Sequence, residues 1–172
     1  MTRDGAAADA IDEIREKWEA IRPDLDYDTI EIVGRLLRAA TVIDRETGVY
    51  LAAAGLNRGE FDVLTALRRA GEPQTPGSLR TVSLASAAAI TKRVQSLERA
   101  GLVERHPNPD DGRGALVYLT SRGQAAVDQA FPDMLAIERR LLAGLSPAQR
   151  SRAIAVLRQV LHSAETEAPT SS

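Results

Sequence analysis

The chain has 172 residues and a net charge of −2; 44% of its residues are apolar, 3% are aromatic and none is cysteine. This length and apolar fraction support one core with helical extensions, the lack of cysteine excludes thiol catalysis, disulfides and thiolate metal sites, and the few aromatics argue against stacking platforms for single strands. No apolar run approaches the roughly 20 residues that span a bilayer and the charged N-terminus lacks a signal-peptide core, so we expect a cytoplasmic protein without membrane contact.

Five helices are predicted before residue 101, from the helical spacing of apolar side chains and from start and stop signals. The starts are Asp28, Asn57 and Ser86 as N-caps and Pro76 in a first turn; the stops are Pro23, Gly55, Gly71 and Gly101. The predicted helices cover residues 8–21, 29–54, 58–70, 76–82 and 87–100.

A strand–turn–strand unit is predicted next. Residues 102–106 and 115–120 are the strand candidates, and the segment PNPDDGRG between them is rich in turn formers.

Two helices are predicted after the strands. The first starts at Thr120 or Ser121 and resumes to about Ala143 after Pro132, which is expected to bend or split it. Ser146 and Pro147 open the last helix, which runs to about residue 164. The polar tail ETEAPTSS is expected to be disordered.

These elements predict a mainly α fold with a small β-wing, a winged helix-turn-helix flanked by N- and C-terminal dimerisation helices. The expected boundaries are 1–55 for the N-terminal helices, 56–123 for the DNA-binding module, 124–164 for the C-terminal helices and 165–172 for the tail. The terminal helices carry apolar stripes too large for one small winged helix to cover. Pairing with a second copy buries them, and a two-fold dimer matches palindromic DNA.

The charge distribution agrees with a DNA-binding module. Residues 1–62 carry 8 basic and 14 acidic side chains, whereas residues 76–123 carry 7 basic and 4 acidic ones. Phosphate attraction depends on the local field, so a basic module on an acidic body can bind DNA. A solvated surface of mixed charge has the same asymmetry.

The helix predicted at 87–100 has a core side and an outward side. Ala87, Ile90, Val94 and Leu97 cluster toward the core. The outward side is small, polar and basic, which suits a major groove, and its predicted DNA contacts are Thr91, Lys92, Gln95, Ser96 and Arg99. An ordinary surface helix has the same pattern, but the strand–turn–strand unit that follows favours DNA.

The turn between the strands carries Arg113, which we expect to enter a minor groove, oriented by Asp111. A plain hairpin turn with an incidental arginine is the alternative.

Arg93 lies on the flank of the buried stripe, away from the DNA side, where a guanidinium requires a partner. Asp62 on the helix predicted at 58–70 is a candidate partner, and Arg105 on the first strand can face the same crevice. Two interpretations stay open: a structural Asp62–Arg93 ion pair, or a pair that lines an effector pocket.

From Leu56 to Gly123 the sequence resembles the MarR family of bacterial transcription regulators. The matching segments are LNRGEFDVLTALRRAG, SAAAITKRVQSLERAGLVER and PNPDDGRGALVYLTSRG, with the wing signature D-x-R at Asp111 to Arg113. The resemblance implies a homodimer that binds double-stranded operator DNA and is released when a small ligand binds.

A narrower resemblance is to the urate-responsive MarR branch. It has a Trp on an extra N-terminal helix, an Asp in the FDVL segment, an Arg in the recognition helix and an Arg on the first wing strand, here Trp18, Asp62, Arg93 and Arg105. This resemblance implies a ligand site for an anionic planar molecule, a urate-like purine or an aromatic carboxylate. A core or dimer-interface aromatic is the other interpretation of Trp18. The chain departs from the branch in a GEPQTPG loop about two residues short and in AAAITKRVQ in the recognition helix.

Two other classes of protein compete with a regulator. An enzyme is not expected, because His106 and His162 lack metal-ligand spacing and no phosphate loop or nucleophile elbow is present, so we predict no cofactor and no metal. An architectural or effector-independent winged-helix DNA-binding protein has the same groove helix, and only the absence of ligand-induced release separates it from a regulator.

Overall fold

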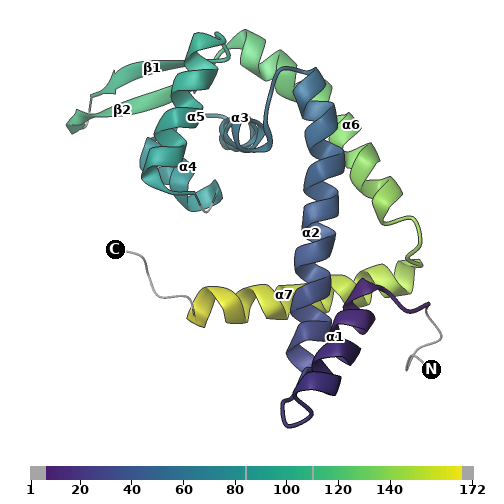
Figure 1. Ribbon diagram of the computed structural model, residues 1–172. Helices are drawn as coiled ribbons and strands as arrows, with labels where there is room; N and C mark the ends of the chain where they lie inside the picture. Colours follow the sequence, from purple (N-terminus) through teal and green to yellow (C-terminus); the bar gives the residue numbers. More distant parts are fainter. Residues whose placement is uncertain (1–6, 84, 110, 168–172) are drawn as a thin grey trace. The chain divides into compact units, whose positions relative to one another are not determined.

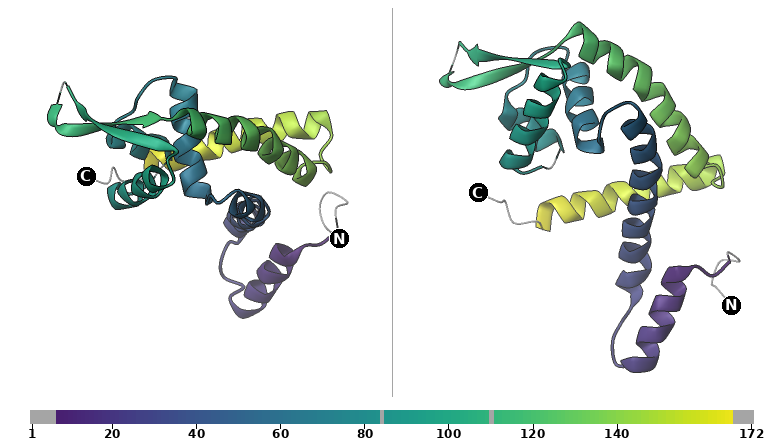
Figure 2. Two further views of the ribbon diagram at one scale, coloured as in Figure 1. Left: turned by 90° about the horizontal axis from the view of Figure 1, so that it is seen from above. Right: turned by 45° about the horizontal axis from the view of Figure 1, so that its top comes forward.

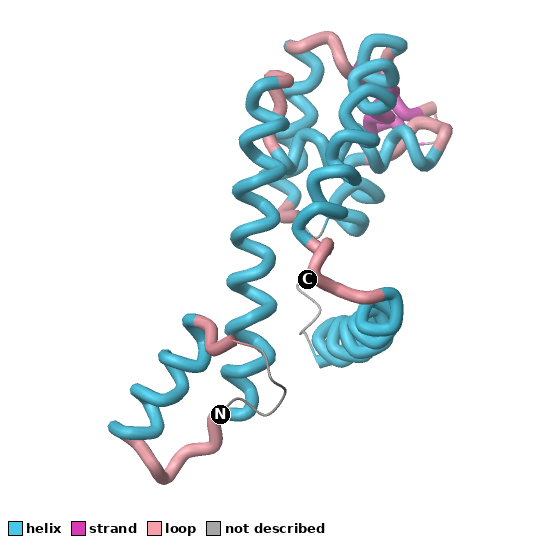
Figure 3. Tube along the Cα trace, turned by 90° about the vertical axis from the view of Figure 1, so that its right-hand side faces the viewer, coloured by secondary structure: helices cyan, strands magenta, loops and turns pink. Residues whose placement is uncertain are grey.

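A computed structural model describes residues 7–83, 85–109 and 111–167 (Figure 1). The elements in chain order are α1 (Ala10–Ile21), α2 (Asp28–Ala53), α3 (Arg58–Ala70), α4 (Pro76–Ser83), α5 (Ala87–Arg99), β1 (Val103–Asn108), β2 (Asp111–Leu119), α6 (Ser121–Leu141) and α7 (Pro147–Glu167). The predicted fold class, mainly helical with one two-stranded wing, is confirmed (Figure 3). Across the described ranges, no helix combines the length and apolar character needed to cross a membrane.

Local capping explains why the winged helix-turn-helix elements begin and end where they do. Asn57 accepts a hydrogen bond from the amide of Glu60 at 3.0 Å, and Glu60 in turn accepts one from the amide of Asn57, which forms a capping box at the start of α3. Ser86 caps α5 through the amide of Ala89. Gly101 then ends α5 with a φ of 69°.

Two predicted boundaries were wrong, and one possible break in a helix does not occur. The N-cap of α2 is Tyr27, and Asp28 is the first residue of the helix. The split of α6 expected as one outcome at Pro132 is absent, because the helix continues through the proline with Val127, Ala130 and Met134 buried on both sides of it; a bend there stays a prediction. α7 continues to Glu167, so the first residues of the predicted tail are helical; residues 168–172 lie outside the described part.

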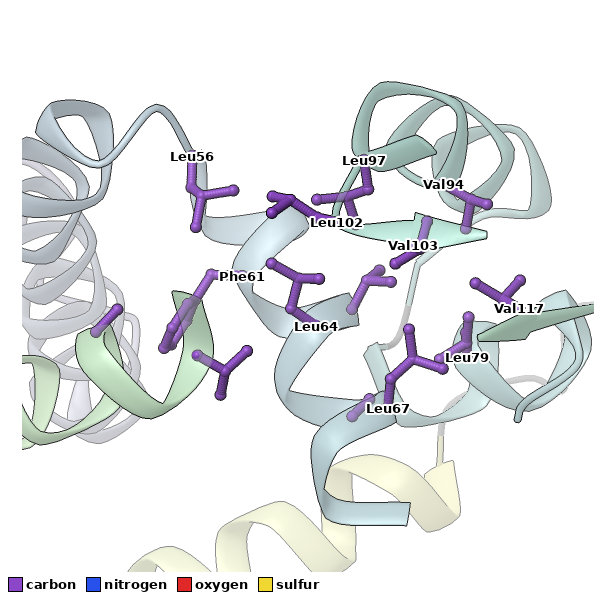
Figure 4. Close-up of a cluster of buried hydrophobic side chains, with 14 of the residues drawn as sticks. Leu56, Phe61, Leu64, Leu67, Leu79, Val94, Leu97, Leu102, Val103 and Val117 are labelled. Carbon is purple, nitrogen blue, oxygen red and sulfur yellow. The ribbon is translucent and has the colours of Figure 1, made fainter. Parts of the chain in front are cut away.

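The chain divides into two compact units, one up to Met134 and one from Leu135 onward. The first unit has a single apolar core built around the leucines of α3. Figure 4 shows Leu64 and Leu67 of α3 with Leu79 of α4, Val94 and Leu97 of α5, and Val103 and Val117 of the two strands around them. This core fixes α5 and the wing on α3.

Helix α1 is fastened to the first half of α2. The Cδ1 atom of Ile11 lies 3.1 Å from where a β-carbon on Gly34 would be, so the absence of a side chain at Gly34 lets the two helices approach. The guanidinium of Arg35 donates to Asp9 at 2.8 Å and to Asp12 at 2.7 Å. Both acids also form the capping box of α1.

The second unit contains the end of α6 and the whole of α7. Ser146 and Gln149 cap α7 through reciprocal hydrogen bonds. None of the residues of α7 is buried, although the helix has 21 residues. Its exposed apolar side chains are Ile154, Val156, Leu157 and Leu161.

Candidate nucleic-acid interface

Helices α4 and α5 form the helix-turn-helix. Leu79 of α4 and Ile90 of α5 are 1% and 0% exposed and belong to one buried cluster, so they hold the two helices together. Val94 and Leu97 continue the buried stripe of α5. The predicted core residue Ala87 is instead exposed, because it lies in the first turn of α5, beyond the packed region.

The predicted DNA-contacting side of α5 faces solvent. Thr91, Lys92, Gln95 and Arg99 are exposed and Ser96 is half-buried. Thr91 donates to the carbonyl of Ala87 at 3.0 Å and Arg99 to that of Gln95 at 3.3 Å. Among the described residues, the side chains of Lys92 and Gln95 have no hydrogen bond or ion pair, so both are available to an external partner.

Strands β1 and β2 form the wing, and their base is anchored in the core. Val103 pairs with Leu119, and both Val103 and Val117 are buried. Gln74, in the loop before α4, adds two backbone hydrogen bonds to Val117, at 3.1 and 2.9 Å. Both views in Figure 2 show the two strands of the wing projecting beyond α4 and α5.

The strands are longer than predicted. The segment PNPDDGRG was expected to be a turn, but β1 extends to Asn108 and β2 begins at Asp111, because cross-strand pairing continues with an irregularity between Pro107 and Asn108. Arg113 lies in β2, and its side chain is outside the described part of the structure, as is that of Asp111. The minor-groove contact of Arg113 therefore stays a prediction.

Arg93 belongs to α5, and its side chain reaches α3, where the guanidinium lies over the first turn. A β-carbon on Gly59 would be 2.3 Å from Nε and 2.5 Å from Cζ of Arg93, so only glycine leaves room for the guanidinium there. The Nη1 atom of Arg93 is buried and has no hydrogen-bond partner among the described residues. An unpaired guanidinium nitrogen at the positive end of a helix is costly, and an anion relieves that cost.

The predicted Asp62–Arg93 ion pair is wrong. Asp62 accepts instead from Nε of Arg58 at 3.1 Å, one helical turn earlier on α3. Arg58 also reaches the hydroxyl of Thr47 at 3.5 Å, and it lines a hollow of about 540 Å³ beside residues 40–44 of α2. The i,i+4 spacing of Arg58 and Asp62 is a helical ion-pair signal in the sequence, and it identifies the pair that was missed.

The structure shows no contact between the other two predicted ligand residues and Arg93 among the described residues. Trp18 is 48% exposed on α1, which packs along the start of α2 near Arg35, whereas Arg58 meets α2 at Thr47. Thr47 comes twelve positions after Arg35 in α2, a rise of about 18 Å along the helix. Arg105 is exposed on β1 opposite Val117. Of the four predicted ligand residues, Asp62 and Arg93 thus both belong to the packed pair α3 and α5, where Arg93 lies beside Gly59 and Asp62 is held by Arg58.

In the described ranges, no group of three or more His, Asp or Glu side chains is placed to hold a metal ion. The surface formed by the exposed side of α5 and the adjacent wing is polar and basic. It offers hydrogen-bond donors and positive charges to a partner.

Comparison with known proteins places this surface in context. Residues 54–114 match the MarR family. The chain is 30% identical to the transcriptional regulator PecS of Dickeya dadantii over 152 residues, which cover 87% of this chain and 92% of PecS. It is 32% identical to the transcriptional repressor NicR of Pseudomonas putida, over 81% of this chain and 88% of NicR.

Two solved structures are similar in fold and sequence. A mutant of Escherichia coli MarR in complex with operator DNA superposes with a TM-score of 0.69 at 30% identity, over 78% of this chain and 97% of that one. BpsR of Bordetella bronchiseptica, whose DNA binding is regulated by 6-hydroxynicotinic acid, gives a TM-score of 0.68 at 28% identity, over 74% and 97% of the two chains.

Proposed function

The chain belongs to the MarR family of DNA-binding transcriptional regulators, and we propose that it is a homodimeric repressor released from palindromic operator DNA by a small anionic ligand. As a member of this family it is a regulator and not an enzyme. The module at 56–123 binds the DNA, and the helices at 1–55 and 124–164 make the dimer.

We place α5 in the major groove. Its exposed side carries Lys92 and Gln95 without partners in the described structure, with Thr91, Ser96 and Arg99 on either side. Gln95 pairs with adenine edges and Lys92 with guanine or phosphate. Arg113 on the wing enters the adjacent minor groove. The fold similarity to a MarR protein solved with operator DNA supports this placement.

A second copy of the chain is the partner of the terminal helices. Most of the stability of helices in proteins comes from the packing of an apolar face, and α7 has 21 residues and no buried side chain. Exposed apolar side chains also occur on α1, on α2, and at and just after the end of α6, among them Ile14, Ile32, Val33, Leu37, Leu141 and Leu142. A two-fold dimer covers such stripes and presents two α5 helices to the half-sites of a palindrome.

The observation that carries the ligand proposal is the unpaired Nη1 atom of Arg93 over Gly59. A carboxylate or a purine anion at this position accepts from the guanidinium and lies at the positive end of α3. Arg58 holds the charge of Asp62, so Asp62 does not compete for Arg93 in the free protein. Aromatic carboxylates are the first ligand class, supported by the regulation of BpsR by 6-hydroxynicotinic acid, and urate-like purines are the second.

Ligand binding reaches the DNA through α5 itself. Arg93 lies between Lys92 and Val94 in that helix, so a ligand that binds its guanidinium and shifts it from its place over Gly59 acts directly on the groove-facing side chains. The ligand favours release only to the extent that it binds the DNA-free arrangement more tightly than the DNA-bound one. Trp18 and Arg105 join the site only if the partner copy or a change in the wing brings them to it.

Operator binding by the purified protein tests the proposal. DNA from its own promoter region is titrated with protein, and then with urate, xanthine, salicylate and 6-hydroxynicotinate. We expect release by at least one of these anions, and we expect Arg93→Met to keep DNA binding and lose release. Tight binding that none of the anions changes would favour the effector-independent DNA-binding protein, and monomers at working concentration would contradict the dimer.

A further inference from the structure

A second hollow lies on the winged-helix unit, between α3 and α6 and away from Arg93. It has a volume of about 480 Å³, within the range of small-molecule sites. Its apolar wall is made by Val127, Phe131 and Pro132 of α6, and its polar wall by Arg68 and Arg69 of α3. Phe131 is 46% exposed, so a large part of its ring faces this hollow or solvent rather than the core.

The charges around the hollow do not balance. Arg68 is paired with Asp128 of α6 through two hydrogen bonds, of 2.9 and 3.2 Å. This pair keeps both groups charged, since the hydrogen bond from Arg68 lowers the pKa of Asp128 and the one to Asp128 raises the pKa of Arg68. Arg69 has no hydrogen bond or ion pair among the described residues. The positive charge of Arg69 is therefore not balanced by a neighbouring acid that the structure describes, and it lies at the same hollow as the partly exposed ring of Phe131.

We propose that this hollow is a second ligand site, which takes an organic monoanion with a flat apolar body. The carboxylate or sulfonate of this ligand lies against Arg69. It also competes with Asp128 for the N–H donors of Arg68, whose planar guanidinium suits such groups. Its apolar body covers the ring of Phe131 and the side chains of Val127 and Pro132. The site joins α3 to α6, and none of the residues proposed for the effector lines it.

Binding at this site stabilises the packing of α6 on α3. In the free protein the Arg68–Asp128 pair and the apolar contacts of Val127 hold these helices together. A ligand that touches both helices binds the folded form alone, so its binding raises the melting temperature. This effect is separate from operator release through Arg93.

The test uses 1-naphthoate with the full-length protein and isothermal titration calorimetry. All titrations are made in an Arg93→Met background, in which the proposed effector site is disabled, so that the failure of one proposal is distinguished from the failure of the other. We expect saturable binding of one 1-naphthoate per chain, and no binding of the neutral 1-naphthamide. Arg69→Gln and Phe131→Ala each weaken it by about tenfold, and Arg80→Gln, which removes an exposed arginine elsewhere, leaves it unchanged.

Asp128→Asn gives the sharpest outcome. It frees Arg68 from its internal partner, so we expect 1-naphthoate to bind about threefold to fivefold more tightly, although the protein itself loses an ion pair. A purely structural role of the Arg68–Asp128 pair predicts no gain. Absence of saturable binding below about 1 mM in the Arg93→Met background overturns the site, and so does binding that neither Arg69→Gln nor Phe131→Ala weakens.

Discussion

The guanidinium of Arg93 lies so close to Gly59 that a β-carbon on Gly59 would be 2.3 Å from Nε of Arg93. The arginine thus occupies the space of a missing side chain in the first turn of α3, with its Nη1 atom buried and unpaired among the described residues. This relationship connects α3, which supports the core, to α5, which we propose reads DNA, and it makes Gly59 the position at which the proposed ligand response can be separated from folding.

Gly59→Ala is expected to abolish ligand response without unfolding the protein. The added methyl group displaces the flexible end of Arg93, and alanine is favoured over glycine in a helix by about 1 kcal/mol. We expect an unchanged or higher melting temperature, normal operator affinity, and a half-maximal ligand concentration raised by about tenfold or more. Gly48→Ala is the matched control, because a β-carbon there has nothing within 4 Å. Equal ligand response in both variants would sink the Arg93 site.

Arg58→Gln is expected to weaken ligand binding by freeing Asp62. Without Arg58, the carboxylate of Asp62 is left to compete for the guanidinium of Arg93, which the ligand needs. The double variant Arg58→Gln/Asp62→Asn removes the competitor and restores most of the affinity. Ligand titrations of the operator complex compare the two variants. A double variant as weak as Arg58→Gln would show that Arg58 contacts the ligand itself and does not act through Asp62.

Arg113→Ala is expected to weaken binding to all DNA sequences similarly and to reduce the salt dependence. A cation in the minor groove neutralises the adjacent phosphates and releases counterions, so the loss of this one charge lowers the slope of log K against log salt concentration by up to about 0.9. Affinities measured at several salt concentrations, on the operator and on unrelated DNA, give this slope. Lys17→Ala on α1 removes an exposed charge outside the DNA-binding module and serves as the control. An unchanged slope for Arg113→Ala would disprove the wing contact.

Gln95→Ala is expected to change base preference more than overall affinity. A bidentate contact between an amide side chain and a base contributes about 1–3 kcal/mol of discrimination, and Gln95 carries no charge, so the salt slope stays constant. Lys92→Ala, three residues earlier on the same exposed side, lowers affinity and slope together. Selection of binding sites from a random DNA pool checks both. A Gln95→Ala variant that selects the original operator refutes the base contact.

Helix α1 is expected to detach from α2 in acid. The pKa of Asp9 is lowered chiefly by the backbone amide of Ile11, that of Asp12 by the amide of Asp9, and both are lowered further by Arg35. Their contribution to stability is therefore present above the ordinary pKa of 3.8 and is lost as the pH falls through the lowered values. Trp18, the single tryptophan, reports this transition by fluorescence.

Arg35→Met removes one cause of the lowered pKa values, so the fluorescence midpoint should move upward toward 3.8. Lys17→Ala, which breaks only the exposed pair with Glu13, is the control and should leave the midpoint in place. Coincident midpoints for the wild type and Arg35→Met would mean that Arg35 does not hold α1.

Most of the fold was predictable from the sequence, because its helix ends are marked by local chemistry. The capping box at Asn57 and the stop at Gly101 depend only on neighbouring residues, and the cap and the stop were both predicted correctly. The split considered at Pro132 does not occur, because the cost of the proline to the helix is local, whereas the burial of Ala130 and Met134 that offsets this cost depends on the tertiary core. The wing strands were underestimated for a similar reason, since cross-strand pairing overrides the turn preference of the segment between them.

The candidate site was predictable in part. The exposed side of α5 follows from helical periodicity, and the structure exposes Lys92 and Gln95 as expected. The partner of Asp62 was predicted wrongly, because a choice between Arg58 and Arg93 depends on how closely α3 and α5 approach. That distance is set by Gly59, and no periodicity in the sequence identifies it.

The backbone hydrogen bonds between Gln74 and Val117 have a mechanical consequence. They connect the loop before α4 to strand β2 at Val117, whose side chain is fully buried. The base of the wing is therefore fixed relative to the start of α4, and the two move together. If α5 and the wing contact DNA as proposed, we expect a DNA site whose bases fit α5 but whose minor groove lies at another angle to bind poorly, so that DNA shape is recognised together with DNA sequence.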